Sequence, residues 1–241
     1  MRHKRFTTTL LTLFTLLLAA ALLGACDTGN PTEVITESVP LGGAEQAEVV
    51  LGMGGGRLNV SGGAEQLMDA EFSFNVDEWA PSVGYEVVGD TGQLAVTQPE
   101  AIGLTIPSDI ENAWDVQLND DIPMDLSIGF GAGEALLELS GLDLTELDIQ
   151  TGAGQVTVDL TGDWNNDLDA EIRGGVGQLV VRLPSETGVR VRATQGLGNL
   201  ESLGLSRDGD FLVNDAYGQT DATLDITIES GIGETRVEVV E

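Results

Sequence analysis

The chain has 241 residues, and 40 Asp and Glu against 10 Lys and Arg give it a formal net charge of −30. So acidic a chain is excluded from binding nucleic acid or anionic lipid through a basic patch. The only lysine and the only histidine lie in the first five residues and Cys26 is the only cysteine, so the rest of the chain cannot supply catalytic His or Lys, a P-loop, a Cys/His zinc site or a disulfide.

Residues 1–25 have the pattern of a secretory signal peptide. Three basic residues in the first five precede an apolar run over 10–23, which is short for a membrane span. Small residues then lead into Cys26, an arrangement that resembles a bacterial lipobox. The resemblance implies that Cys26 is lipidated and anchors an extracytoplasmic protein to the cell membrane. Cleavage before Cys26 would bring the net charge to about −33, because three basic residues leave with the signal.

Residues 26–40 are polar and contain two prolines, which predicts a flexible tether. The folded domain is expected over 41–241. It opens on the segment Gly42–Gln46, which is repeated letter for letter at Gly62–Gln66.

The stretch Leu147–Leu160 shows the plan that the domain repeats. Apolar or small residues occupy odd positions up to Ala153, and even positions from Val156 onward. Alternation predicts half-buried strands, and glycine allows a sharp turn between them. The sequence therefore predicts a strand, a glycine corner and a second strand. Equivalent corners are expected at Gly52–Gly54, Gly131–Gly133, Gly175–Gly177, Gly196–Gly198 and Gly231–Gly233.

The spacing of the corners predicts an all-β repeat fold. Second glycines at 133, 154, 177 and 198 give steps of 21, 23 and 21 residues. Such a period predicts a β-helix-like β-solenoid with coils of about 21 to 23 residues. Regular coils are expected over 126–205, degenerate coils over 61–125, an excursion over 206–218 and a final coil over 219–241. An antiparallel β-meander remains the alternative, because a two-residue hairpin at Gly152-Ala153 also inverts the alternation.

The alternation also predicts individual positions. One side of the core is expected to hold Leu137, Leu139, Val156, Val158, Leu179 and Val181, and the other Leu147, Ile149, Ile172, Val189 and Val191. Strands in the degenerate region are expected near 70–76, 83–87, 93–96 and 114–118. Stacking of successive coils predicts three charge pairs, Asp169–Arg190, Glu171–Arg192 and Asp159–Arg182. The last strand, Thr235–Val239, is expected to be an open edge. It is expected to be covered by another subunit, by a partner strand, or by the excursion over 206–218 folding back.

Patterns that suggest ligand sites are incomplete. Acidic or amide side chains alternate over 163–171, but Leu168 and Gly174 stand where an EF-hand needs glycine and glutamate. The aromatic residues are dispersed, which favours core or capping roles over a sugar platform. No metal, cofactor or catalytic residue is therefore assigned, and Cys26 is the one site residue expected. The dispersed aromatics are Trp79, Tyr85, Trp114, Trp164 and Tyr217.

Four segments resemble bacterial lipoproteins with a toast-rack domain, which are related to LiaF-type and adhesin-like envelope domains. These segments are Ser38–Ala44, Glu71–Trp79, Glu146–Gly162 and Val213–Gly218. The resemblance implies a β-rich repeat fold and a location in the cell envelope. It implies no catalytic residues.

Together these patterns predict a non-enzymatic, lipid-anchored cell-envelope protein whose repeat β surface serves interaction, adhesion or envelope-stress sensing. One alternative is a polysaccharide-active enzyme on a β-helix scaffold, which requires carboxylates to converge in a groove with Arg173, Arg182, Arg190 or Arg192. Another is a cation-binding surface protein.

Overall fold

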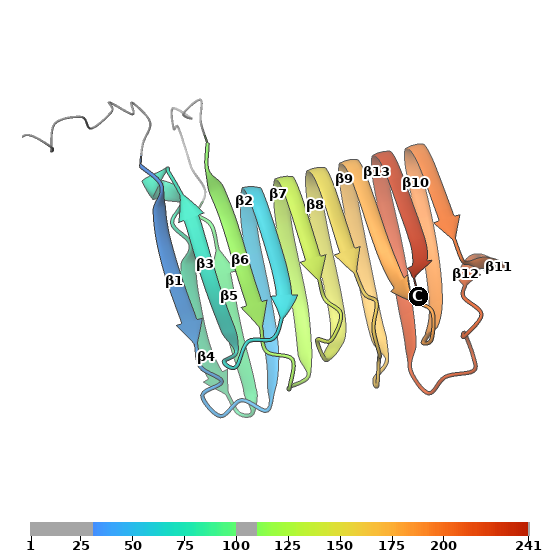
Figure 1. Cartoon of the computed structure of the whole chain (residues 1–241), viewed down its shortest axis with the longest axis horizontal. Helices are drawn as coiled ribbons and strands as arrows, with labels where there is room; N and C mark the ends of the chain where they lie inside the picture. Colours follow the sequence, from blue (N-terminus) through green and yellow to red (C-terminus); the bar gives the residue numbers. More distant parts are fainter. Residues whose placement is uncertain (1–30, 100–109, 241) are drawn as a thin grey trace, which may run out of the picture. The chain divides into compact units, whose positions relative to one another are not determined.

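The computed structural model describes residues 31–99 and 110–240, and this part of the chain is almost entirely β-structure (Figure 1). It contains no α-helix and one short 3-10 helix, η1 (Asp77–Trp79). None of its helices is long and apolar enough to cross a membrane. The expected signal peptide and Cys26 lie outside the described residues. The strands are β1 (Glu33–Val39), β2 (Gln46–Gly62), β3 (Met68–Phe74), β4 (Ser82–Val88), β5 (Thr91–Thr97), β6 (Asn112–Leu118), β7 (Met124–Glu138), β8 (Leu144–Asp159), β9 (Leu168–Pro184), β10 (Gly188–Leu203), β11 (Ser206–Asp208), β12 (Phe211–Val213) and β13 (Thr223–Val240).

The long strands β2, β7, β8, β9, β10 and β13 each bend once at a glycine corner (Figure 1). Their first halves form one layer of the fold, here called the first layer, and their second halves form the second layer. Neighbouring long strands run parallel, with Ile149 of β8 in register with Ile172 of β9 and Val158 with Val181. Parallel pairing confirms the predicted solenoid and rules out the antiparallel meander.

The core lies between the two layers. All eleven residues that the alternation assigned to it are buried, and Leu137, Leu147 and Val158 are each 0% exposed. Burial of a large aliphatic side chain contributes about 1.5 to 3 kcal/mol, so each residue of these columns stabilises the fold.

Glycine is required at the corners by close backbone stacking as well as by conformation. Gly154 has a φ of +133°, and a Cβ there would lie 1.9 Å from the carbonyl oxygen of Gly133 on the neighbouring strand. A Cβ on Gly152 would lie 2.3 Å from the carbonyl oxygen of Gly131. The residue between the two glycines, Ala153, is exposed. Corners of adjacent strands therefore stack glycine on glycine.

The first corner is Gly54–Gly56, so the prediction of a corner at Gly52–Gly54 was wrong. Met53 is only 2% exposed and continues the inward series of the first half of β2. Gly56 has the positive φ, +131°, and pairs with Gly133 at the next corner. The sequence has glycine at 52, 54, 55 and 56, and the burial of Met53, the positive φ of Gly56 and its pairing with Gly133 together locate the corner.

The last strand of the chain, β13, is not at an edge. It lies between β9 and β10 and runs parallel to both. Thr235–Val239 is therefore an internal segment, and the prediction that it forms an open edge was wrong. Inward residues in both halves of the strand are buried, as shown by Ile226 and Val237, each 0% exposed.

The inserted strand also separates two of the three predicted charge pairs. Asp169 is in register with Asp225 of β13, which is in turn in register with Arg190. The Asp169–Arg190 pair was therefore wrong by one strand. The same displacement separates Glu171 from Arg192, because Thr227 of β13 lies between them. The third pair is confirmed, since β8 and β9 are true neighbours and Asp159 lies 3.6 Å from Arg182.

The region 61–125 contains the four expected strands, as β3 to β6, but they do not form successive coils. β5 and β6 run parallel to the first and second halves of β2, so together they make a single coil that is interrupted at its corner. β4 pairs antiparallel with β5, and β3 pairs antiparallel with β6. Antiparallel strands therefore cover this end of the solenoid, because each short strand can reverse direction without a full coil.

The expected tether over 26–40 includes a strand that belongs to the folded domain. Residues 33–39 form β1, which pairs antiparallel with β3. Val39 is buried and Ile35 packs against the core. Because the segment is mostly polar, its two inward apolar residues did not reveal a strand, and the predicted domain boundary at 41 was placed too late.

The excursion over 206–218 folds back on the solenoid. It forms β11 and β12, and β12 pairs antiparallel with β10 at Arg190 and Val191. The hairpin therefore covers part of β10 in the first layer.

Candidate functional site

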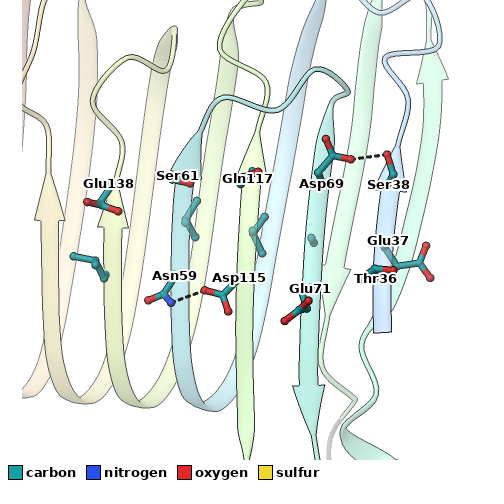
Figure 2. A pocket seen from close by; sticks show the side chains of 14 residues that line it. Thr36, Glu37, Ser38, Asn59, Ser61, Asp69, Glu71, Asp115, Gln117 and Glu138 are labelled. Atoms are coloured by element: carbon teal, nitrogen blue, oxygen red, sulfur yellow. Dashed lines mark hydrogen bonds between the residues drawn. The ribbon is translucent and has the colours of Figure 1, made fainter. Parts of the chain in front are cut away.

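A groove of about 550 Å³ lies on the outer face of the second layer, across β1, β3, β6, β2 and β7 (Figure 2). The strands that form it come from three separate stretches of the chain, 33–39, 57–74 and 112–138. The groove is lined by Thr36, Glu37, Ser38, Asn59, Val60, Ser61, Asp69, Ala70, Glu71, Asp115, Val116, Gln117, Leu136 and Glu138.

Strand register arranges most of the polar lining in two rows that cross the sheet. Outward residues alternate along each strand, so residues in register on neighbouring strands face the same side. Every side chain in the two rows except that of Leu136 can form hydrogen bonds with a ligand. One row consists of Ser38, Asp69, Gln117, Ser61 and Glu138, and the other of Thr36, Glu71, Asp115, Asn59 and Leu136.

Two carboxylates in the groove are held in place by neighbouring strands. Ser38 Oγ donates a hydrogen bond of 2.6 Å to Asp69 Oδ1, and Asn59 Nδ2 donates one of 2.6 Å to Asp115 Oδ1 (Figure 2). These contacts orient the acids without neutralising them, because a hydroxyl and an amide carry no charge.

The groove is an acceptor-rich surface. Among the described residues, five carboxylates and no arginine line it. Leu136, which is 39% exposed, adds an apolar contact at the β7 end. The complementary ligand carries hydrogen-bond donors such as hydroxyl or ammonium groups. The five carboxylates belong to Glu37, Asp69, Glu71, Asp115 and Glu138.

The arginines that an enzyme hypothesis required are not brought together. Arg173 lies in the first layer, where it contacts Asp148 at 3.0 Å and also pairs with Glu171. Arg182 lies in the second layer between Asp159 and Glu238, at 3.6 and 3.5 Å. Each of these two arginines is thus engaged by carboxylates of its own or a neighbouring strand.

The other two candidate arginines lie on β10 in the first layer. Arg190 pairs with Asp225, and this hydrogen bond raises the pKa of the guanidinium group above its usual value. Arg190 and Arg192 also stack on the ring of Phe211 in β12, at 4.7 and 4.6 Å from its centroid. Neither lines the groove, so the convergence of acids and arginines that a polysaccharide-active site needs is not seen.

The acids over 163–171 do not gather around a common point. Within residues 31–99 and 110–240, no group of three or more His, Cys, Asp or Glu side chains is placed to hold a metal ion. Asp167 instead accepts a hydrogen bond of 2.8 Å from the backbone N–H of Thr223. Its role is to join the start of β13 to the loop before β9.

The aromatic residues support the fold. Trp114 is fully buried and packs edge-to-face on Phe72, with ring centroids 5.2 Å apart. Trp164 Nε1 donates to the carbonyl oxygen of Leu160 at 2.9 Å. Tyr85 donates to the carbonyl oxygen of Leu41 at 2.6 Å, and burial raises the pKa of its phenol. Trp79 packs against the core. These four side chains do not form a common platform for a sugar.

Sequence reasoning did not find the groove, because no contiguous motif encodes it. Its rows depend on β1 and β3 pairing antiparallel beside β6, and the sequence predicted parallel coils there. The only local signal was the run of polar residues at outward positions of each strand, and such runs occur along the whole domain.

The two-layer bent-strand solenoid defines the chain as a repeat β protein of the toast-rack class. The family model described as the N-terminal domain of toast_rack, DUF2154, matches residues 28–182, which is more than half of the chain. The chain belongs to the toast-rack family.

One solved structure agrees with this assignment, and a second is a more distant match. A "putative cell adhesion protein" from Clostridium sporogenes ATCC 15579 is 31% identical, with a TM-score of 0.83, and the match covers 87% of this chain and 100% of that chain. A "putative adhesin" from Bacteroides fragilis NCTC 9343 is 10% identical, with a TM-score of 0.34, over 88% of this chain and 98% of that chain. No curated protein matches the chain.

Proposed function

We propose that the chain is a non-enzymatic adhesion protein of the cell envelope, held at the membrane by a lipid on Cys26. The observation that carries the proposal is the clostridial structure described as a "putative cell adhesion protein", which this chain matches along that structure's entire length at 31% identity. The signal-like residues 1–25 and the position of Cys26 support the anchor.

The groove on the second layer is the proposed adhesive surface. Its two rows of carboxylate, amide and hydroxyl groups can accept several hydrogen bonds at once from a ligand that lies across the strands. A hydroxyl-rich surface polysaccharide has this chemistry and this extended form. A polyanionic ligand would be repelled by five carboxylates that have no arginine among them.

Binding to immobilised cell-surface polysaccharide tests the proposal. The double variant Glu71→Gln with Asp115→Asn keeps the shape of the groove and removes two charged acceptors. We expect its affinity to fall about tenfold or more, since hydrogen bonds to charged groups are the stronger ones. A matched control is Asp221→Asn with Glu229→Gln, which makes the same charge change at exposed positions away from the groove. Equal binding by all three proteins would refute the groove as the adhesive surface.

The same samples separate adhesion from catalysis. Incubation of the polysaccharide with the wild-type protein should release no new reducing ends or unsaturated products. Release by the wild-type protein that is lost in the groove variant would show an enzyme.

For the anchor, Cys26→Ala should leave a precursor without lipid, and membrane-bound protein with the usual mass increase in that variant would overturn the assignment.

A further inference from the structure

The second half of β10, Leu197–Leu203, is an open edge of the second layer. On its inner side this segment pairs with β13 in continuous register. On its outer side the described part of the chain places no strand, because β12 covers β10 only at Arg190 and Val191 in the first layer. A row of backbone N–H and C=O groups is therefore available to another strand.

This edge is apolar where most of the molecule's surface is acidic. Leu197 is 68% exposed and Leu203 is 43% exposed, and Leu200 between them is only partly buried against the core. At the corner, Leu197 continues a ridge of exposed apolar side chains formed with Ile232 and Val176, which are 53% and 54% exposed and in register with it. Contiguous exposed apolar residues are typical of an interaction surface.

Charge does not oppose association here, in spite of the acidity of the chain. The segment 188–213 carries three arginines and three acids. The one acid on the open edge, Glu201, is paired with Arg236 of β13 at 2.9 Å. Edge strands that avoid association usually carry unpaired charges, proline or a bulge, and Leu197–Leu203 has none of these.

The side chains of this edge are complementary to themselves. When two copies of the segment run antiparallel about a two-fold axis through Leu200, Leu197 of each copy lies opposite Leu203 of the other. In the same register, Asn199 lies opposite Glu201, so an amide donor meets a carboxylate acceptor. A register centred on Glu201 would instead place two glutamates opposite each other, and one centred on Asn199 would place Leu197 opposite Glu201. Directly opposed residues on antiparallel strands are in contact, which favours the register centred on Leu200.

We propose that a second copy of this chain docks on the second half of β10, forming a two-fold dimer whose second layers join into one continuous antiparallel sheet at this edge. The proposal goes beyond the adhesive role and does not depend on it, since the groove and this edge lie at opposite ends of the second layer.

Sedimentation velocity on the purified protein over a range of concentrations tests the dimer. Leu203→Glu should raise the dimer dissociation constant about tenfold or more, because it places a charge opposite Leu197 of the other copy. Leu136→Glu is the matched control, since Leu136 is 39% exposed on the same layer but lies in mid-sheet on β7, and it should leave the dissociation constant unchanged. Thermal melts of both variants show whether the fold is intact.

The register has its own test. Leu197→Lys alone should weaken the dimer as Leu203→Glu does, and the double variant with both substitutions should restore it, because the new opposite charges face one another only in the register centred on Leu200. A wild-type protein that stays monomeric up to roughly millimolar concentration overturns the proposal. A dimer that resists Leu203→Glu, or that the double variant fails to restore, overturns this edge or this register.

Discussion

Arg190 on β10 and Asp225 on β13 form an ion pair across neighbouring parallel strands. The two residues are in exact register although 35 positions separate them in the chain. Between them the chain completes β10, forms the β11–β12 hairpin and returns to occupy the place beside β9. In the order of the sequence, the outer strand β10 therefore comes before β13, which lies between it and β9. β13 is the only strand that joins β10 to the rest of the described solenoid.

Ending the chain at Ala222 should release β10 while leaving distant strands intact. Solenoid strands are stabilised mainly by their neighbours. The loss of β13 therefore removes the one strand that pairs with both β9 and β10. In hydrogen exchange, we expect β9 and β10 to lose protection and β2 and β7 to keep theirs. Full protection of β10 in the shortened chain would contradict the inserted topology.

Adjacent leucines on β7 give a matched test of the two-layer core. Leu137 is 0% exposed and Leu136 is 39% exposed, and their side chains point to opposite faces of one strand. Leu137→Ala should lower the free energy of unfolding by about 2 to 5 kcal/mol, because it leaves a cavity in the core. Leu136→Ala should cost less than about 1 kcal/mol. Denaturant unfolding measures both, and similar losses would mean that the inward assignment is incorrect.

The glycine corners should tolerate a side chain at one position and not at the next. Gly154→Ala places a Cβ 1.9 Å from the carbonyl oxygen of Gly133 and demands a φ of +133° from alanine. We expect a loss of more than about 3 kcal/mol, since the backbone strain alone costs about 1 to 3 kcal/mol. Ala153→Val should be nearly neutral, because Val176 occupies the equivalent corner position in β9. Thermal unfolding of the pair distinguishes a stacked corner from an open turn.

Local patterns in the sequence determine which residues face inward, and for this reason the core columns and the regular corners could be predicted. They do not determine which strand lies beside which. Asp159 and Arg182 were paired correctly because β8 and β9 are consecutive in the chain and adjacent in space. Asp169 and Arg190 were paired incorrectly, because β13 lies between their strands. The repeat period of the sequence does not show that a strand from later in the chain is placed there. The groove was not predicted for the same reason, because its rows depend on which strands are neighbours in the sheet.

Stability should fall at alkaline pH through Tyr85. Burial raises the pKa of its phenol above the ordinary value of about 10, and its hydroxyl donates to the carbonyl oxygen of Leu41. Below that ordinary value the phenol is protonated in both states and its contribution is fully present. As the pH rises toward the folded-state pKa, the unfolded chain loses the proton first and the free energy of unfolding decreases. Tyr85→Phe should flatten this decrease between about pH 9 and 11. An identical slope in the variant would show that Tyr85 is not its source.

Asn214 fastens the turn between β9 and β10 from inside the fold. The residue is 5% exposed, and its Nδ2 donates to the carbonyl oxygens of Thr187 at 2.7 Å and Pro184 at 3.2 Å. Its Oδ1 accepts the backbone N–H of Val189 at 2.9 Å. The residue belongs to the Val213–Gly218 segment that resembled the toast-rack family, so this network gives that segment a physical role.

Replacement of Asn214 should therefore lower the free energy of unfolding, and in one of two variants the size of the loss should depend on pH. Asn214→Ala leaves three buried backbone groups without a partner, and we expect a loss of about 3 kcal/mol or more because each such group costs about 1 to 3 kcal/mol. Asn165→Ala, at an exposed amide in the loop before β9, should stay within about 0.5 kcal/mol of the wild-type protein. Asn214→Asp keeps the acceptor for Val189 but turns the donor into an oxygen that faces two carbonyls.

An ionised carboxyl is disfavoured at that position, so its folded-state pKa would be raised. The stability of Asn214→Asp relative to the wild-type protein should then be highest at acid pH, where the protonated carboxyl can donate one hydrogen bond, and should decrease as the pH rises through that pKa. Denaturant unfolding of both proteins at about pH 4 and pH 7 measures the difference. A deficit that is the same at both pH values would mean that position 214 does not face the carbonyl oxygens of Pro184 and Thr187.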